Sequence, residues 1–286
     1  MPYEVRCFAT SDVAAFMAMA SSFLQARVDQ CNQVLGFVRD AQAPSMTAAV
    51  FAVATCEGQA VAVLAWCPVR IAISEGPEPA IRLLVTTLIQ RGLQISVLKG
   101  PVEAVNSFAD EIRQQAHGKK AEVTEEALLY RCDALNAGVK MPKGAGRRPT
   151  VEDLDRFCNL LEEDKGGAVD RAQFRELLAD PEFCNTFFVW CSEDGTIVAK
   201  AKYTDRTPHG RETAPIAVLQ GVFTPADSRG KGYATGVMYG LCEALLKQYK
   251  LLVLYVEKTN GPANRLYQKI GFKEVEESKM VKFVDP

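Results

Sequence analysis

The chain is poor in the residues that build metal centres and in long apolar runs. It has two histidines, far apart, and its nine scattered cysteines form no C-x-x-C pair, so the sequence contains no recognisable zinc site. No stretch reaches the roughly 18 consecutive apolar residues of a membrane-spanning helix. The formal net charge of −2 gives no reason to expect nucleic acid or an anionic membrane as a partner.

Signals for export are also absent. Residues 13–24 are fairly apolar, but Asp12 precedes them and no basic region introduces them, which is unlike a secretory signal. Most cysteines lie in apolar surroundings, as reduced thiols of a protein core do. We therefore expect an intracellular protein in a reducing, cytoplasmic compartment, without a bound metal; the sequence does not indicate its oligomeric state.

Length and composition fit two globular domains. The chain has 286 residues, of which 48% are hydrophobic and 24% charged, enough for two ordinary cores. An order of helices, three strands, helix, strand, helix and strand occurs twice, with a period of about 140 residues, which is typical of duplicated domains. We predict domains over 1–135 and 150–286. The segments that carry this pattern are helical residues 11–39, 80–90, 102–115, 151–162 and 171–178 and strands 48–56, 60–67, 69–74, 95–98, 123–132, 186–191, 196–204 and 216–224.

The stretch between the halves, 136–149, differs in composition from both. It carries three glycines, two prolines and the basic residues Lys140, Lys143, Arg147 and Arg148. Such a composition favours a solvated linker, and a basic binding patch is the alternative.

The most informative stretch is 216–272. It begins with an apolar strand, 216–224, in which Gly221 can form a bulge. Residues 229–234 (RGKGYA) follow. Apolar side chains then recur at the spacing of one helix face, which predicts a helix running to about Gln248. The residues at this spacing are Ala234, Val237, Met238, Leu241 and Leu245.

A glycine-rich turn that opens a helix is suited to bind phosphate. The first N–H groups of the helix have no internal partner, and they lie at the positive end of its dipole. Gly230 and Gly232 would let oxyanions approach the backbone, and Arg229 and Lys231 would add positive charge. A loop that only caps the helix is the alternative.

Residues after this helix complete a recognisable order. A buried strand, 251–257, leads to Asn260-Gly261-Pro262, which opens a second helix with proline in its first turn. Asn264 and Tyr267 share one face of that helix, and Gly271 ends it. This order resembles the GNAT superfamily of acyl-CoA-dependent N-acetyltransferases. Residues 229–234 match its pyrophosphate motif, and 260–272 (NGPANRLYQKIGF) match its later asparagine–tyrosine helix.

The resemblance implies the fold and the reaction. The fold class is α/β (α+β), with two tandem GNAT-like domains, each a mixed, mostly antiparallel twisted sheet flanked by helices. The activity is acetyl transfer from acetyl-CoA to a primary amine by direct attack in a ternary complex. In place of RGKGYA, the first half has residues 74–79 (SEGPEP), whose acids repel phosphate and whose prolines lack N–H donors. We therefore expect a degenerate N-terminal copy and a catalytic C-terminal copy.

The resemblance also assigns roles to residues. The backbone of Val222, Phe223 and Thr224 maps onto the segment that pairs with the pantetheine arm, and the Val222 N–H could polarise the thioester carbonyl, or simply pair with a neighbouring strand. Tyr267 maps onto the general acid; its alternative role is core packing. Asn264 maps to the cofactor arm, and Asn260 caps the helix or contacts the cofactor. The full cofactor-binding set is Val222, Phe223, Thr224, Arg229, Gly230, Lys231, Gly232, Tyr233, Ala234, Thr235, Asn260, Asn264 and Tyr267.

The general base and the acceptor stay open. Many family members carry a glutamate on the strand where this chain has only Gln220 as a polar residue before Val222. Glu257 is a candidate catalytic base and Tyr255 another, and a chain of waters is a third possibility. Two alternative functions remain: a dinucleotide site, because Gly230, Gly232 and Gly236 precede a strand that ends in an acid, and a non-catalytic acyl-CoA-binding or protein-interaction module.

Overall fold

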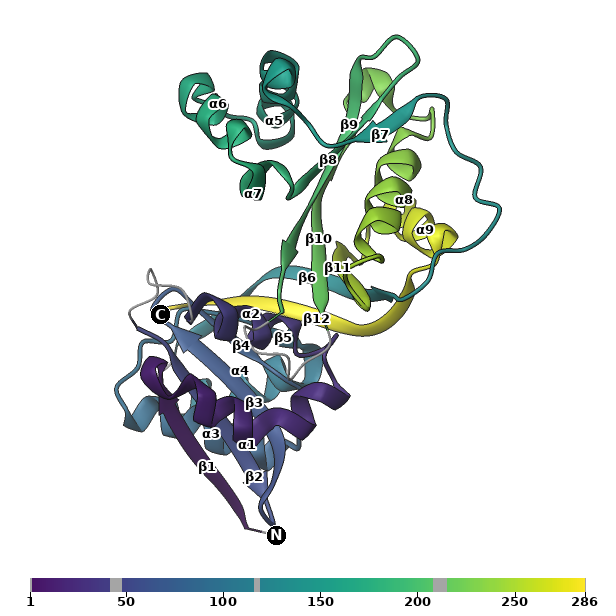
Figure 1. Ribbon diagram of the computed structural model, residues 1–286. Helices are drawn as coiled ribbons and strands as arrows, with labels where there is room; N and C mark the ends of the chain where they lie inside the picture. The colour runs from purple at the N-terminus through teal and green to yellow at the C-terminus, as the bar shows by residue number, and fades with distance from the viewer. Residues whose placement is uncertain (1, 42–47, 116–118, 208–214, 286) are drawn as a thin grey trace.

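The computed structural model describes residues 2–41, 48–115, 119–207 and 215–285. Within them, twelve strands form one sheet in the order β1-β2-β3-β4-β5-β12-β6-β11-β10-β9-β8-β7 (Figure 1). The strands are Tyr3–Ala9 (β1), Val50–Cys56 (β2), Gln59–Cys67 (β3), Arg70–Ile73 (β4), Val97–Pro101 (β5), Lys120–Cys132 (β6), Ala145–Arg147 (β7), Phe187–Cys191 (β8), Ile197–Asp205 (β9), Ile216–Phe223 (β10), Leu251–Glu257 (β11) and Lys273–Val284 (β12). The α-helices are Val13–Ala26 (α1), Asn32–Ala41 (α2), Glu78–Gln90 (α3), Val102–Gln115 (α4), Leu154–Lys165 (α5), Arg171–Ala179 (α6), Pro181–Cys184 (α7), Tyr233–Leu245 (α8) and Gly261–Ile270 (α9).

The sheet is mixed and mostly antiparallel. Among the described strands, the parallel neighbours are β4 with β5 and β10 with β11. A doubly wound parallel sheet, which the dinucleotide-binding alternative requires, is therefore not present in this part of the chain. Gly236 also has a structural reason, because an added Cβ would lie 2.7 Å from the Trp190 ring. The predicted fold class is confirmed.

The two halves exchange their last strands. Strand β12, from the end of the chain, lies between β5 and β6, and β6 from the first half lies between β12 and β11. Ser278 pairs with Pro101 across β12 and β5, and Leu252 pairs with Cys132 across β11 and β6. In Figure 1 the yellow β12 runs where the upper and lower parts of the molecule meet. The predicted division at 135 and 150 thus separates sequence repeats but cuts through one hydrogen-bonded sheet.

Helices cover both faces of the sheet in the first half. Strand residues alternate between faces, so Ala52, Leu64 and Ile71 pack under α3 and α4, whereas Phe51 and Val63 pack under α1 and α2. Burial on both faces explains why these strands read as continuous apolar runs. In the second half α8 and α9 share a core with Leu219 and Leu254, and α5 and α6 share one with Phe187 and Val189 on β8.

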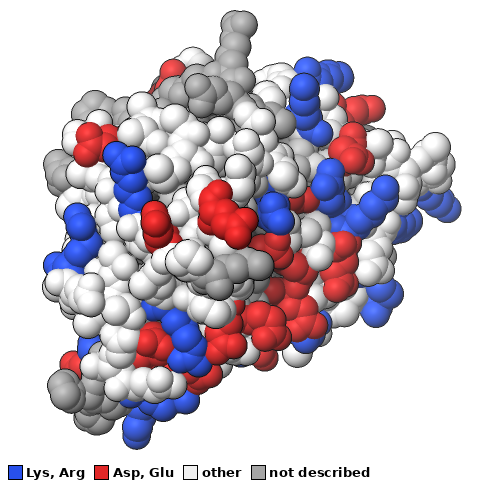
Figure 2. Space-filling model, turned by 90° about the horizontal axis from the view of Figure 1, so that it is seen from below, with Lys and Arg blue, Asp and Glu red and all other residues white. Residues whose placement is uncertain are grey.

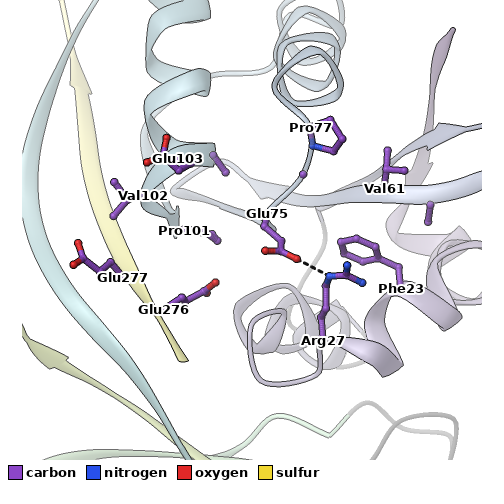
Figure 3. Close-up of a pocket in the computed structure, with 13 residues that line it drawn as sticks. Phe23, Arg27, Val61, Glu75, Pro77, Pro101, Val102, Glu103, Glu276 and Glu277 are labelled. Carbon is purple, nitrogen blue, oxygen red and sulfur yellow. Dashed lines mark hydrogen bonds and ion pairs between the residues drawn. The ribbon is translucent and has the colours of Figure 1, made fainter. Parts of the chain in front are cut away.

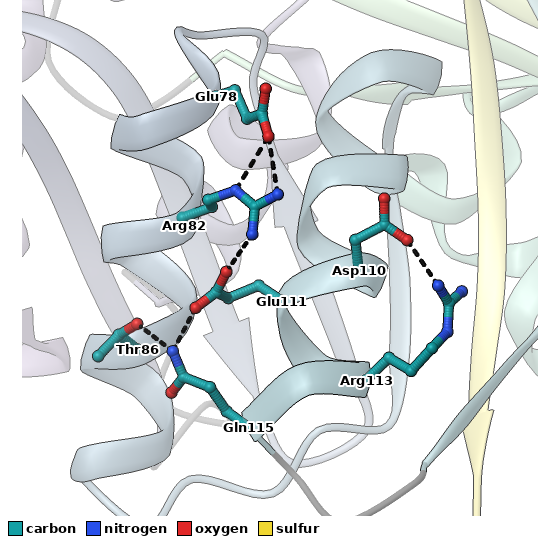
Figure 4. A network of polar contacts seen from close by, with 7 residues as sticks. All are labelled: Glu78, Arg82, Thr86, Asp110, Glu111, Arg113 and Gln115. Carbon is teal, nitrogen blue, oxygen red and sulfur yellow. Dashed lines mark hydrogen bonds and ion pairs between the residues drawn. The ribbon is translucent and has the colours of Figure 1, made fainter.

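A polar network joins α3 to α4 and begins at Glu78, in the first turn of α3 (Figure 4). Arg82 donates to Glu78 at 2.8 Å and to Glu111 at 2.6 Å, and Gln115 donates to Glu111 and to Thr86. Carboxylates next to the N-terminus of α3 already use the favourable end of its dipole. This helix start therefore differs from the start of α8, which carries no acidic residue in its first turn.

The predicted linker is partly ordered. Residues 145–147 form β7, the edge strand beside β8, and the Trp190 indole donates to the Lys143 carbonyl at 3.3 Å. An added Cβ at Gly146 would lie 2.5 Å from the Phe188 ring, so this glycine permits close packing. Residues 145–147 of the predicted solvated linker thus pair with the sheet, although Ala145 and Arg147 are exposed. The strand β1 was not predicted either, because its residues lie largely half-buried or exposed at the other sheet edge.

Six cysteines are buried, as their apolar sequence surroundings predict: Cys31, Cys67, Cys132, Cys158, Cys191 and Cys242. Both histidines lie outside the described residues. Within the described ranges, no helix is long and apolar enough to cross a membrane, and no three side chains of the metal-binding types gather closely enough to hold an ion.

Candidate active site

A cleft opens where β10 and β11 separate. Their parallel pairing runs from Ile216 with Leu251 to Leu219 with Leu254 and stops there, although both strands continue. The space between the diverging ends has a volume of about 590 Å³. Its lining combines both strands with Arg229 and α9. The predicted site residues that line it are Val222, Phe223, Thr224, Arg229, Ala234, Glu257, Asn260 and Tyr267.

A bulge in β10 takes residues 221 and 222 out of the regular strand pairing beside this cleft. The antiparallel register with β9 shifts between Gln220 and Phe223, and Gly221 has a φ of +61°, which glycine adopts without strain. Val222 has no Cα partner in the registers with β9 or β11. The predicted bulge at Gly221 is confirmed, and the Val222 N–H is not part of a regular ladder.

The glycine loop leads directly into α8. Gly230 has a φ of +76° and Gly232 a φ of +83°, and Gly232 is the residue immediately before the helix. A Cβ on Gly230 would meet no protein atom within 4 Å. The left-handed backbone is therefore what requires glycine here, and the space next to it is open. Gly230, Lys231, Gly232, Tyr233 and Thr235 lie beside the cleft rather than in its lining.

The two basic side chains of the loop are held by backbone carbonyls. Arg229 donates through Nε to the Thr224 carbonyl at 3.1 Å, and Lys231 donates to the Asp227 carbonyl at 3.1 Å. Both residues are exposed. Together with the start of α8 they place positive charge at one end of the cleft, which is where an anionic group would be attracted.

Two polar atoms near the cleft are buried without a protein partner. Within the described residues these are Thr224 Oγ1 and Asn264 Oδ1. The Asn264 amide nitrogen is already used, because it donates to the Asn260 carbonyl at 2.9 Å and to the Glu257 carbonyl at 3.3 Å. Asn260 accepts from the Ala263 N–H at 3.2 Å and so caps α9. Buried polar atoms usually find partners, so a polar ligand in the cleft would complete this arrangement.

Tyr267 is both a core residue and a lining residue. It is 8% exposed, and its ring centroid lies 5.9 Å from that of Phe272. Burial, with a smaller contribution from Cys242, raises its pKa to about 12. The phenol therefore keeps its proton throughout the neutral range, as a general acid must.

The two candidate bases differ in their surroundings. Glu257 ends β11, is exposed and lines the cleft. The Tyr255 hydroxyl accepts from Asn32 of the first half at 2.8 Å, and burial raises its pKa, which opposes formation of a phenolate. Tyr255 therefore fits a structural contact between the halves better than a base.

The first half has a corresponding cleft with a different lining (Figure 3). The parallel pairing of β4 and β5 ends at Ala72 with Lys99, and a cavity of about 760 Å³ follows, which is lined in part by Glu75, Glu103, Glu276 and Glu277. Arg27 pairs with Glu75 at 2.6 Å. Burial raises the pKa of Glu276 to about 7. So many carboxyl groups disfavour a pyrophosphate, in agreement with the prediction from residues 74–79.

Acidic side chains also gather on the outer surface of the molecule. The face seen from below carries a dense group of Asp and Glu side chains, whereas Lys and Arg are scattered around it (Figure 2).

Sequence reasoning missed several residues of the site. Leu254, Pro262 and Leu266 contribute apolar lining, but nothing in their sequence pattern separates them from other core residues. Lys200 lies in β9, is 2% exposed and donates to the carbonyl of Gly221 at 3.2 Å. The signal available in the sequence was a lysine inside a buried apolar strand, which is rare without a partner.

Comparisons with known proteins agree with this geometry. The profile of the acetyltransferase (GNAT) family matches residues 154–272. An aminoglycoside N(6')-acetyltransferase type 1 from Serratia marcescens is 32% identical over 109 residues, which are 37% of this chain and 73% of that protein.

Solved structures extend the likeness to the whole fold. A GCN5-related N-acetyltransferase from Sphaerobacter thermophilus matches with a TM-score of 0.60 and 17% identity, over 99% of this chain and 96% of the other. A tandem GNAT protein from the clavulanic acid biosynthesis pathway matches with a TM-score of 0.54 and 11% identity, over 100% of this chain and 99% of the other. The chain therefore belongs to the GNAT acetyltransferase family and has its tandem form.

Proposed function

We propose that this protein is an acetyl-CoA-dependent N-acetyltransferase that acts on a primary amine in the cleft between β10 and β11. The observation that carries this proposal is the arrangement around the cleft. One wall has the backbone of Val222, which lies outside the regular strand register, and another has the phenol of Tyr267. Family membership supports acyl transfer to an amine in general. In this proposal residues 150–286 are the catalytic copy and 1–135 the degenerate one, with their last strands exchanged.

The cleft suits the cofactor. Acetyl-CoA would supply an activated thioester, a polar amide-bearing arm and a pyrophosphate. The N-terminus of α8 and Arg229 would hold the pyrophosphate. Thr224 Oγ1 and Asn264 Oδ1, both buried without protein partners, are suited to hydrogen bonds with polar groups of the arm.

Two groups of the chain would act on the thioester. The Val222 N–H would donate to the carbonyl oxygen as negative charge develops on it. The Tyr267 phenol would protonate the departing thiolate. With a pKa of about 12 the phenol is a weaker acid than an ordinary thiol of pKa about 8.5, so this transfer depends on close contact. Burial would also raise the pKa of the thiol leaving group.

No cysteine is among the described residues that line the cleft, which fits direct attack by the amine. The cysteine that interacts electrostatically with Tyr267 is Cys242. It is buried, and burial raises the pKa of its thiol well above the usual value. A thiol of this kind is a poor nucleophile. We infer a ternary complex without a covalent enzyme intermediate. The buried thiols also fit a reducing, cytoplasmic location.

The proposed activity is tested by release of CoA thiol from acetyl-CoA with a panel of amines. Aminoglycosides are the first acceptors to try, because the curated relative is named for them; amino acids, polyamines, peptides and proteins complete the panel. Turnover with one class and product mass increased by one acetyl group would support the proposal. Tight acetyl-CoA binding without turnover on any acceptor would favour the non-catalytic binding module instead.

Replacing Glu257 by glutamine tests the candidate base. If this carboxylate accepts the amine proton, the turnover number should fall by about 10²-fold, within the usual range for general base catalysis. The Kd for acetyl-CoA should stay within about two-fold. The matched control is Glu274→Gln, an exposed glutamate on β12. Equal turnover in both variants would contradict the role and favour a water chain.

A further inference from the structure

The strand beside the cleft contains a buried lysine whose position is unusual. Lys200 is 2% exposed and lies on β9, opposite Phe223 of the bulged strand. Its ammonium donates to Asp164 on α5 at 2.7 Å and to the Gly221 carbonyl at 3.2 Å. Burial lowers its pKa, and the partner Asp164 opposes this effect.

Stability alone does not explain this pair. Removing two charges from water costs several kcal/mol, and well-packed apolar residues often replace a buried ion pair without loss. The pair is also not a simple surface contact, since the Lys200 side chain is 3% exposed and that of Asp164 24%. The third partner, a backbone carbonyl in the bulge, is the distinguishing feature.

That carbonyl belongs to the same peptide group as the Val222 N–H. A peptide group is planar and trans, so its C=O and its N–H point in opposite directions. The bulge leaves this group outside the regular register with β9 and β11. Without another restraint it could rotate about its flanking bonds, the more so because Gly221 is conformationally permissive.

From this geometry we infer that Lys200 is a positioning residue for the oxyanion donor: it holds the Gly221 carbonyl and thereby aims the Val222 N–H into the cleft. Because the C=O and N–H of one peptide group point in opposite directions, the N–H points away from the ammonium, and both Gly221 and Val222 line the cleft. A cation on the carbonyl also polarises the peptide and makes its N–H a better donor. Asp164 keeps the lysine in place and connects it to α5. This inference rests on the proposed function.

The test uses the full chain and a double substitution, Lys200→Met with Asp164→Leu. Removing both partners avoids an uncompensated buried charge, so the variant is expected to fold; thermal unfolding checks this. We expect the turnover number to fall by about 10- to 100-fold. This fall should be no larger than the one that removal of an oxyanion donor itself causes. The Km for acetyl-CoA should stay within about three-fold. If the double variant does not fold, Lys200→Gln replaces it in the comparison with the wild type. Glutamine retains a shorter, neutral donor, so its turnover number should fall by an intermediate amount.

A second readout needs no acceptor. Infrared difference spectra of bound acetyl-CoA, labelled with carbon-13 in its acetyl carbonyl, report polarisation of that carbonyl directly. The wild-type protein should shift the carbonyl band to lower frequency, and the double variant should shift it less. Lys202→Met is the matched control: Lys202 is on the same strand, is half-buried and has its ammonium 5.9 Å from the Phe187 ring. Its spectrum and turnover should match the wild type.

The outcomes separate the two proposals. An equal carbonyl shift and equal turnover in the wild type and the double variant would overturn the role of Lys200 while leaving the acetyltransferase proposal intact. A wild-type protein that binds no acetyl-CoA would overturn the proposed function and this inference with it. A smaller shift together with reduced turnover at unchanged Km would support the positioning role, because a purely structural pair would not alter the carbonyl of a bound ligand.

Discussion

Replacing Gly232 by aspartate is expected to reduce CoA affinity by at least about 100-fold. Gly232 has a φ of +83° and directly precedes α8. An aspartate there places a carboxylate at the helix N-terminus, where it takes the favourable end of the dipole and repels a pyrophosphate. Two charges 4 Å apart interact by about 4 kcal/mol near a protein surface, which is more than the predicted loss requires. Calorimetric titration with CoA measures the effect.

The control for this substitution is Gly58→Asp. Gly58 has a φ of +76° in the turn between β2 and β3, and an added Cβ meets nothing within 4 Å there. An aspartate at this position is therefore strained in its backbone much as one at Gly232 is, but it lies away from the cleft. Both variants should unfold at similar temperatures, and only Gly232→Asp should lose CoA. Undiminished CoA affinity in a folded Gly232→Asp protein would show that the pyrophosphate binds elsewhere.

Replacing Tyr267 by phenylalanine should lower the turnover number by about 10²-fold, the lower range for a general acid. The ring is kept, so the packing against Phe272 and the Kd for acetyl-CoA should change little. The loss should appear in kcat rather than in binding, because the proton is needed only in the transition state. Pre-steady-state measurements ensure that chemistry, not product release, is followed.

The pH dependence gives this prediction a sign. The protonated phenol is the active form, and a pKa of about 12 keeps it protonated well above pH 10. Any high-pH decline caused by Tyr267 should therefore lie above that value, and it should be absent in the phenylalanine variant. Tyr239→Phe, on α8 outside the cleft lining, is the control. More than half of the wild-type turnover in Tyr267→Phe would leave this tyrosine as a core residue only.

Local pattern predicted several elements of this protein well. The helix Val102–Gln115 and the strand Leu251–Glu257 have the predicted bounds, because continuous periodicity and clear turn residues surround them. The helix after the glycine loop ends at Leu245, three residues before its predicted end, since helix ends fray. The separate motifs at 229–234 and 260–272 indicated the family because each requires particular residue types at particular positions.

Other features depend on partners far away in the chain. The edge strand β7 has only three residues, and the glycines and prolines of 136–149 suggested a linker there; the pairing of β7 with β8 makes these three residues part of the sheet. The corresponding cleft of the first half depends on Glu276 and Glu277, which come from the other end of the chain. No pattern within residues 74–79 could indicate them.

By itself the sequence determined the repeat, the glycine loop and the helix that carries Tyr267, because each depends on periodicity or on backbone preferences over a few residues. Only the tertiary structure decided which strands pair at the centre of the sheet, since a strand's pattern shows that it pairs but not with which neighbour. It also decided that the ammonium of Lys200 reaches Gly221 and Asp164. That contact joins three segments separated by 21 and 36 residues, and burial of a charge is favourable only once all of them are in place.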